Sequence, residues 1–517
     1  IPRNGHRSRA AGAMGRTLGP DDTMITNEEG TVSDRTAPAE PLFSLRTFID
    51  TADRLGELRH VRGADWDLEL GAIAELSYRT PRPKALLFDD IPGYPTGRVL
   101  TGSTGSARRL GATLRLGDDL DDADVVRLLR GKPSRWAAAA RDHPVRPVDT
   151  APLLANQVAG ADVDLLAFPV PRWHAHDGGR FIGTGCLVVT SDPETGVTNG
   201  GCYRMEVTDG GRSATIAAVP GKHGAQDIAR WFEREGRAPV TVSFGHDPLL
   251  LVAGGTEVPR GVSELEYAGA VAGERMPVII GERTGLPIPA GSEIAVEGWL
   301  RPDLKRDEGP FGEWTGYYSG ARRPCLALEI ERLYHRDDPI LLGAPPGRPP
   351  HDYSYMRTVM KSAMIEDELV ATGVPGIRSA WAHEAGGGRL FVAVSIEQRY
   401  AGHARQVGAL AAQLPAAAYM NRYVVVVDDD IDPSSLDQLI WAISTRTDPS
   451  VDIEILRRAW GSKLDPMLAT DATPYNSRAV IDACRPYERL ATFPRVAESS
   501  PEYLRSVHDR WRHVLDT

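Results

Sequence analysis

The chain has few cysteines and no long apolar segment, and both absences limit the classes of protein to which it can belong. Only four of its 517 residues are cysteine, Cys186, Cys202, Cys325 and Cys484, and none forms a CxxC pair. This spacing excludes a disulfide framework or zinc ribbon and predicts reduced thiols in a cytoplasmic protein. No apolar run approaches the roughly 18–20 residues that a membrane helix needs, so we expect no membrane partner.

An excess of basic charge and the common nucleotide-binding motifs are also absent. The chain carries 59 Lys and Arg against 70 Asp and Glu, a net charge of −11, which argues against a nucleic-acid partner. There is no Walker loop, no GxGxxG after a strand and no GxSxG elbow. Readings as a nucleotide hydrolase, a Rossmann enzyme or an α/β-hydrolase therefore lack support.

The length predicts two or three domains, because one ordinary core does not extend over 517 residues. Residues 1–40 are Arg- and Gly-rich without an apolar segment, and they predict a disordered leader and not a secretory signal. Residues 41–157 predict an α/β segment. Its expected elements are a helix over 42–61, a helix, a turn and a buried strand within 67–91, and a helix over 121–130 that stops at Gly131 and Pro133.

Residues 158–345 alternate short β-rich runs with Gly, Pro and Asp, a pattern that predicts a barrel or sandwich-like domain. Two helices, over 225–236 and 263–273, interrupt it. Residues 346–460 predict a C-terminal α/β domain of alternating strands and helices. The remaining tail, 461–517, is expected to be irregular and to end in an amphipathic helix over 501–515.

The stretch RDEGPFGEWTGYYSG places Glu308 and Glu313 around a Gly-Pro-Phe-Gly turn. Proline and glycine are unfavourable in regular elements, so this segment is expected to be a shaped loop that presents two carboxylates. In NGGCYRMEV, Asn199 and Arg204 follow a strand, and the two glycines allow a ligand to approach the backbone. An arginine directed at two glutamates keeps them ionised or lets them exchange roles as one is protonated.

Further polar residues suit a phosphate and a metal ion. His223 precedes a helix beside Lys222, and a helix N-terminus with an adjacent lysine suits a phosphate. Together with Asn199 and Glu264, His223 supplies ligand types suited to Mn²⁺ or Mg²⁺, although spacing alone does not assemble the three. The histidines at 174 and 176 are more simply non-ligating, and the acidic run 428–432 is more simply a solvated strand terminus.

Taken together and in order, EGPFGEWTGYY, NGGCYRMEV, VPGKHGAQDIARW and VDDDIDPSSLDQLIWAISTR resemble the UbiD family of prenylated-FMN-dependent decarboxylases. The similarity runs from about residue 45 to 470. It implies a flavin-reductase-like split β-barrel cofactor domain between the N-terminal α/β segment and a C-terminal α/β oligomerisation domain.

The resemblance also assigns roles to residues. It implies a catalytic network of Glu308, Arg204 and Glu313, and a metal held by Asn199, His223 and Glu264. It implies cofactor contacts from Asn199, Cys202, Tyr203, Arg204, Ala217, Ala218, Val219, Lys222, His223 and Glu264. A potassium ion is implied near the VAGGT segment, 252–256. Some members carry a lysine before the strand of the acidic run, and LPAAAYMNRYVVVV has none, so phosphate neutralisation must rest on Lys222, the metal or another group.

The implied activity is the reversible non-oxidative decarboxylation of an aromatic, heteroaromatic or α,β-unsaturated acid, with Arg204 orienting the substrate carboxylate and Glu313 as proton donor. The segment 351–356 is expected to line the substrate pocket and to favour a planar aromatic acid. A flavin prenyltransferase would supply the cofactor, and a homo-oligomer is expected, a dimer before a hexamer. Two alternatives are an FMN-dependent reductase and a non-catalytic scaffold subunit, the latter disfavoured because buried charges are costly.

Overall fold

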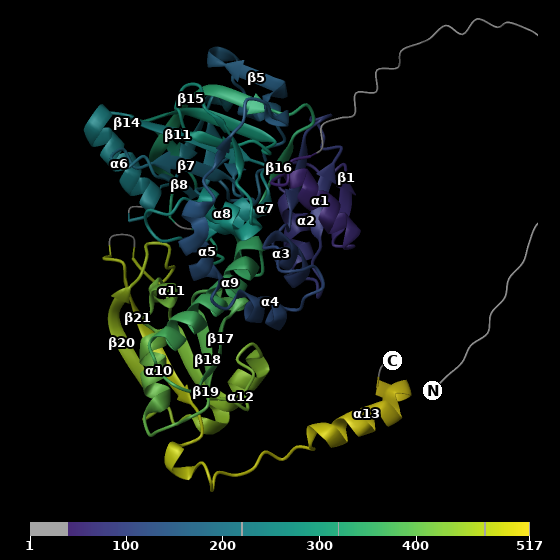
Figure 1. Ribbon diagram of the computed structural model, residues 1–517, viewed down its shortest axis with the longest axis vertical. Coiled ribbons are helices and arrows are strands. Elements are labelled where there is room, and N and C mark those ends of the chain that lie inside the picture. The colour runs from purple at the N-terminus through teal and green to yellow at the C-terminus, as the bar shows by residue number, and fades with distance from the viewer. Residues whose placement is uncertain (1–39, 219–220, 319, 470–471, 516–517) are drawn as a thin grey trace, which may run out of the picture. The chain divides into compact units, whose positions relative to one another are not determined.

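The computed structural model describes residues 40–515 except 219–220, 319 and 470–471, and its elements form a mixed α+β fold (Figure 1). The predicted leader, 1–40, lies outside the described residues except for Glu40. None of the described helices is long and apolar enough to span a membrane. All four cysteines are unpaired.

The N-terminal part combines a small sheet with five helices, and one predicted helix is shorter than expected. The elements are α1 (Leu45–Arg54), β1 (Leu58–Arg62), α2 (Glu69–Tyr78), β2 (Ala85–Asp89), β3 (Arg98–Thr101), α3 (Ala107–Thr113), α4 (Asp122–Leu129) and α5 (Lys132–Ala139). The prediction of one helix over 42–61 was wrong, because Gly56 takes a positive φ of 67° and the chain turns into β1. β1 then pairs in parallel with β2.

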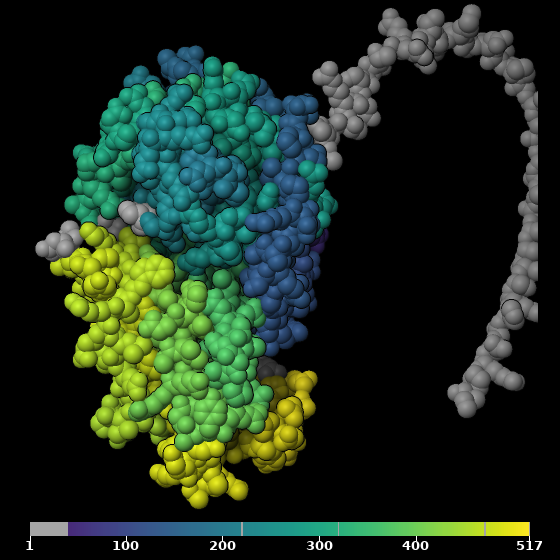
Figure 2. Space-filling model, turned by 60° about the vertical axis from the view of Figure 1, so that its left-hand side comes forward, coloured from purple at the N-terminus to yellow at the C-terminus, as the bar shows by residue number. Residues whose placement is uncertain are grey.

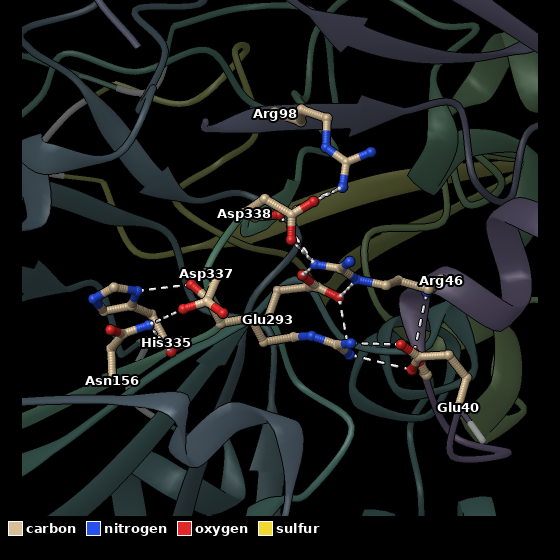
Figure 3. A network of polar contacts seen from close by, with 10 residues as sticks. Glu40, Arg46, Arg98, Asn156, Glu293, His335, Asp337 and Asp338 are labelled. Atoms are coloured by element: carbon tan, nitrogen blue, oxygen red, sulfur yellow. Dashed lines mark hydrogen bonds and ion pairs between the residues drawn. The ribbon is translucent and has the colours of Figure 1, made fainter. Parts of the chain in front are cut away.

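Ion pairs clamp this N-terminal part to the central domain (Figure 3). Arg46 on α1 binds the buried carboxylate of Glu293 through Nε and Nη2, each at 2.9 Å. The same guanidinium contacts Asp338 at 2.9 Å, and Arg98 on β3 contacts that carboxylate at 3.0 Å. β16 (Ile340–Leu342) follows Asp338 and joins the N-terminal sheet in the order β1-β2-β3-β16.

The central domain is a nine-stranded, largely antiparallel sheet. Its strands are β5 (Asn156–Ala159), β6 (Phe181–Gly183), β7 (Leu187–Ser191), β8 (Thr198–Gly201), β9 (Met205–Thr208), β10 (Ser213–Ile216), β11 (Ala238–Phe244), β14 (Ile294–Glu308) and β15 (Arg323–His335). The order is β6-β9-β10-β15-β14-β11-β7-β8, with β5 paired to β15. The path is open over the described residues, so no closed barrel is present there. The long β14–β15 hairpin ends where the Glu308 loop begins.

Three helices and a small sheet complete the central domain. The helices are α6 (His223–Glu235), α7 (Pro248–Gly255) and α8 (Glu264–Ala272). The small sheet contains β4 (Arg146–Pro147), β12 (Pro277–Ile280) and β13 (Pro287–Pro289). α6 and α8 occur where the sequence predicts them, whereas α7 was not predicted because its residues 248–253 are all buried and show no helical periodicity.

The C-terminal domain is a five-stranded sheet with flanking helices, drawn green to yellow in Figure 1. Its elements are α9 (Asp352–Ala371), β17 (Ile377–Ala382), β18 (Phe391–Ile396), α10 (His403–Ala411), α11 (Pro415–Ala418), β19 (Tyr423–Asp428), α12 (Leu436–Arg446), β20 (Ile453–Trp460) and β21 (Tyr475–Ala483). The strand order is β17-β18-β19-β21-β20. Figure 2 shows the surface of this domain meeting that of the central domain.

The expectation of an irregular tail after residue 460 was wrong for β21. This strand pairs in parallel with β19 and antiparallel with β20, so it lies inside the sheet. Its polar residues hide the strand pattern, since Arg478 is buried and donates to backbone carbonyls such as that of Trp460 at 3.1 Å. The terminal helix, α13 (Pro501–Leu515), is present as predicted and buries none of its side chains.

Candidate active site

The loop after β14 is shaped by close contacts at its Gly-Pro-Phe-Gly turn. Gly309 has a φ of 89°, which favours glycine, and its N–H donates to Glu206 at 2.7 Å. Phe311 stacks on Phe181 of β6 with ring centroids 4.0 Å apart. A Cβ atom at Gly178 would lie 1.9 Å from the carbonyl oxygen of Gly309, so the turn packs directly on backbone. These contacts fix the positions of both glutamates.

Arg204 joins the two glutamates in one buried network. Its Nε and Nη2 contact the two carboxylate oxygens of Glu308 at 2.5 and 2.8 Å, and its Nη1 contacts Glu313 at 2.6 Å. The Glu308 side chain is fully buried, whereas those of Arg204 and Glu313 are 11% and 14% exposed. The sequence predicted an arginine directed at two glutamates, and in the structure the side chain of Arg204 contacts both of them.

The surroundings of Arg204 favour its charged form. Burial opposes the charge of Arg204, but the hydrogen bond with Glu308 and the charges of both glutamates outweigh it and raise the pKa of the guanidinium. The thiol of Cys325 lies 3.5 Å from Glu308, and burial together with the charge of Glu308 raises the pKa of this thiol to about 11. The thiol therefore stays neutral and can donate to the carboxylate.

The predicted metal ligands come from three elements that meet around two glycines. Asn199 is on β8, His223 is the first residue of α6, and Glu264 is the first residue of α8. Gly200, next to Asn199, donates its N–H to Glu264 at 2.5 Å. A Cβ atom at Gly224, next to His223, would lie 3.1 Å from Nδ2 of Asn199. The fold thus brings the neighbourhoods of all three residues together.

Three side chains bear on whether this place can hold a cation. Nδ2 of Asn199 is buried and has no hydrogen-bond partner in the part of the chain that the structure describes. This nitrogen is a donor, so a cation would be bound by the amide oxygen, Oδ1. Burial raises the pKa of Glu264 to about 8, because no basic side chain compensates its charge. Burial and the charges of Arg260 and Lys222 lower the pKa of His223, which favours the neutral imidazole that binds metals. No described cluster consists of three His, Cys, Asp or Glu side chains arranged for a metal ion, so Asn199 is needed to complete this set.

The other predicted cofactor residues lie on or beside the same strands. Cys202 approaches the end of α7, where its N–H donates to Gly254 at 3.4 Å. Tyr203 fills the space between β8 and α6, since a Cβ atom at Gly224 would lie 2.7 Å from its Oη. Ala217 donates to the carbonyl of Arg204 at 3.2 Å. Ala218 follows it, and Val219 lies outside the described residues.

Lys222 is held near the C-terminal domain, in a cluster that sequence reasoning missed. Its Nζ lies 3.8 Å from Glu257, which also binds Arg389 at 2.8 Å and Lys361. Burial lowers the pKa of Lys222. These residues lie far apart in the sequence, and no local motif connects them. Only the packing of α9 and the loop before β18 against α7 reveals the cluster.

Three further predictions concern single segments. His351 is buried and lines a cavity of about 180 Å³ together with residues of the loop between β14 and β15, among them Tyr317 and Tyr318. His174 lies 3.7 Å from Asp177 and belongs to no described metal cluster. The acidic run was wrongly interpreted as solvated at Asp428, which is buried and pairs with Arg446 at 3.0 Å.

Comparisons with known proteins agree with this geometry. Three family profiles match, the N-terminal (residues 49–129), Rift-related (145–349) and C-terminal (354–483) domains of 3-octaprenyl-4-hydroxybenzoate carboxy-lyase. A phenolic acid decarboxylase of Streptomyces sp. (strain D7) is 30% identical over 89% of this chain and 96% of its own. A pyrrole-2-carboxylic acid decarboxylase of Pseudomonas aeruginosa is 30% identical over 90% and 97%.

Solved structures show the same arrangement of domains. HmfF, a UbiD-class enzyme from Pelotomaculum thermopropionicum in complex with FMN, aligns with a TM-score of 0.77 at 26% identity and covers 89% of this chain and 98% of its own. Vanillic acid decarboxylase from Sedimentibacter hydroxybenzoicus aligns with a TM-score of 0.77 at 26% identity over 92% and 99%. The family resemblance seen in the sequence is therefore confirmed, and the chain belongs to the UbiD family of carboxy-lyases.

Proposed function

We propose that this chain removes CO₂ from an aromatic or heteroaromatic carboxylic acid, reversibly and without net oxidation, using prenylated FMN. The observation that carries this proposal is the buried guanidinium of Arg204 between Glu308 and Glu313. The names of the phenolic and pyrrole carboxylic acid decarboxylases support the substrate class. The FMN and prFMN complexes of HmfF support the flavin. The central sheet would serve as the split-barrel cofactor domain.

The two glutamates are proposed to have different roles because their side chains differ in burial, with Glu308 at 0% and Glu313 at 14% exposed. Glu308 is fully buried and contacts the guanidinium through both carboxylate oxygens, so it fixes the orientation of Arg204. Glu313 is in contact with Arg204, keeps part of its side chain exposed, and follows the turn at Phe311. It can therefore take up a proton and give it to the carbon that loses CO₂. Arg204 orients the substrate carboxylate. When bound, prenylated FMN supplies an electrophilic carbon that accepts the electron pair left by CO₂.

Asn199, His223 and Glu264 are proposed to hold Mn²⁺ or Mg²⁺ beside the phosphate of the cofactor. The N-terminus of α6 has no side-chain cap, so its first N–H groups are available to an anion. Lys222 precedes that terminus and adds a positive charge. A potassium ion near residues 252–256 belongs to the same proposal, as do contacts of the flavin with Cys202, Tyr203, Ala217 and Ala218.

The partners of the chain are proposed from the same resemblance. A flavin prenyltransferase would supply the cofactor, and the chain would form a homodimer through the C-terminal domain. Exposed apolar side chains on that domain support a dimer, and they include Ile440, Trp441 and Trp460, which are 57%, 42% and 61% exposed.

The test is to co-express the chain with a flavin prenyltransferase, to release the bound small molecule and to measure its mass and absorption spectrum. The mass of prenylated FMN, together with CO₂ release from an aromatic acid, is the expected result. Plain FMN combined with NAD(P)H oxidation would contradict the proposal and favour a flavin reductase. A protein without flavin would favour a scaffold.

A further inference from the structure

Arg357, in the second turn of α9, carries a charge that no described side chain neutralises directly. Its Nε and Nη1 atoms are out of contact with solvent, and neither has a hydrogen-bond partner among the residues that the structure describes. The residue as a whole is only partly buried, but a guanidinium stays charged in proteins, and leaving its buried N–H groups without partners is unfavourable. This arginine therefore lacks the counter-ion that its position requires.

The surroundings of Arg357 place it beside the catalytic network. Its guanidinium carbon lies 5.2 Å from the ring of Trp314, the residue after Glu313. It lies 5.6 Å from the ring of Tyr353. Its charge also acts on the thiol of Cys202, two residues before Arg204. Arg357 is thus near both segments that supply the proposed catalytic residues.

The basic residues around Glu257 leave an excess of positive charge there. Glu257 binds Arg389 at 2.8 Å, Lys361, and Lys222 at 3.8 Å. With Arg357 there are four cations, and the carboxylate of Glu368, which acts on Lys361, is a second negative charge beside Glu257, so the excess is 4 − 2 = 2 positive charges. Burial and the charge of Arg389 lower the pKa of Arg357 to about 9. An added anion would relieve this repulsion.

We propose that Arg357 binds an oxyanionic group of the substrate that the reaction retains, so that the substrates of this chain carry a second acidic group, a carboxylate or a phenolate. This inference rests on the proposed function. The leaving carboxylate is a poor partner for Arg357, because Arg204 is already proposed to orient it, and a second cation there would further stabilise the ground state in which its charge still exists. A retained oxyanion is bound equally before and after CO₂ loss, and the planar fork of arginine suits it.

The phosphate of the flavin is the other oxyanion at this site, and the experiment distinguishes the two sources. In protein loaded with plain FMN, the binding of terephthalate and isophthalate is compared with that of their mono-amides by calorimetry. The mono-amides keep the shape and one carboxylate but lose the second charge. Plain FMN lacks the decarboxylating carbon, so this binding is measured without turnover. If the acids bind as inferred but the prenylated-FMN enzyme releases no CO₂, only the proposed function fails.

We expect at least one diacid to bind tenfold or more tightly than its mono-amide. Arg357→Gln should remove this preference and Arg357→Lys should retain part of it. Arg389→Gln, which removes the same charge from a guanidinium already bound to Glu257, should retain most of it. Equal affinities in the wild type, or equal losses in Arg357→Gln and Arg389→Gln, would overturn the inference.

Two further measurements separate a structural role and a phosphate contact from substrate binding. Ligand-free Arg357→Gln should melt at or above the temperature of the wild type, since it removes a partly buried cation whose Nε and Nη1 have no partner among the described residues. A lower melting temperature would show that Arg357 supports the fold. The affinities for FMN and riboflavin should keep their wild-type ratio in Arg357→Gln. A selective loss of FMN affinity would assign the arginine to the phosphate and overturn the inference.

Discussion

The indole of Trp314 lies so close to Gly387 that a Cβ atom at position 387 would be 2.6 Å from its Cε3 atom. Trp314 belongs to the loop after β14, and Gly387 belongs to the C-terminal domain between β17 and β18. The same domain supplies Arg389, whose guanidinium lies 5.9 Å from the indole. The position of the proposed acid, Glu313, is therefore tied to the docking of the C-terminal domain.

This contact predicts that Gly387→Ala lowers turnover. The added methyl group must displace Trp314 and with it Glu313, and a shift of about 1 Å in an active site costs roughly 10²-fold in rate. Gly387 also has a φ of 64°, so alanine adds about 1–2 kcal/mol of backbone strain. Steady-state kinetics and thermal melts of the holoenzyme measure the two effects.

Gly373→Ala is the matched control for the strain. Gly373 has a φ of 79° and no atom within 4 Å of its added Cβ. The Gly373→Ala variant should lose a free energy of unfolding similar to that lost by Gly387→Ala, and it should keep its turnover. Equal losses of turnover in both variants would show that the contact with Trp314 has no role.

A second prediction concerns Glu313. Glu313→Gln keeps the shape of the side chain but removes the exchangeable proton, so kcat should fall about 10²- to 10⁴-fold while flavin content and melting temperature stay near those of the wild type. Asp307→Asn, an exposed change one residue before Glu308, removes the same charge and should keep full activity. Decarboxylation by Glu313→Gln within threefold of the wild-type rate would exclude it as the acid.

The cation site gives a third prediction. A methyl group at Gly224 would lie 2.7 Å from Oη of Tyr203 and 3.1 Å from Nδ2 of Asn199. Gly224→Ala should therefore reduce bound metal and bound flavin together, although alanine favours the α6 helix by about 1 kcal/mol. Metal analysis and flavin absorbance measure both. Normal contents of metal and flavin would count against Asn199 as a ligand.

The sequence contains the motifs of the proposed catalytic network because each of its parts is local. Glu308 and Glu313 flank one turn, and Arg204 follows a glycine pair, so short motifs define each part. The cluster at Glu257 could not be predicted, since Lys222, Lys361 and Arg389 reach it from three separate elements. Periodicity likewise failed wherever burial was complete or polar residues were buried, as in α7 and β21.

A fourth prediction tests the clamp shown in Figure 3. Arg46→Met leaves the fully buried carboxylate of Glu293 with only a longer contact to Arg336 at 3.5 Å. The free energy of unfolding should fall by about 3 kcal/mol, the cost of breaking a buried ion pair. Chemical denaturation measures this loss.

Two variants check the origin of that loss. Arg98→Met removes a contact with Asp338, whose side chain is 51% exposed, and should cost less than about 1 kcal/mol. Adding Glu293→Gln to Arg46→Met should restore part of the stability, because the amide carries no charge to bury. If the double variant is no more stable than Arg46→Met alone, the loss comes from the packing of the aliphatic part of the Arg46 side chain.

The last prediction concerns the pH dependence of stability at Glu384. Burial raises the pKa of Glu384 from 4.5 to about 7, and the charges of Asp122 and Asp352 add to this effect. Ser354, at the start of α9, donates a hydrogen bond to its carboxylate at 2.8 Å. Between pH 4.5 and 7 the folded protein binds the proton that the unfolded chain has released, so the contribution of Glu384 to stability is complete below pH 4.5 and is lost as pH rises through 7.

Glu384→Gln should remove this contribution from the pH profile. The difference in unfolding free energy between variant and wild type should shift in favour of the variant by about 3 kcal/mol from pH 4.5 to pH 8. Glu75→Gln, a change in a side chain that is 42% exposed on α2, should show no such shift. Denaturation curves at both pH values measure the shift, and a pH-independent difference would mean that Glu384 is ionised in the folded protein throughout this range.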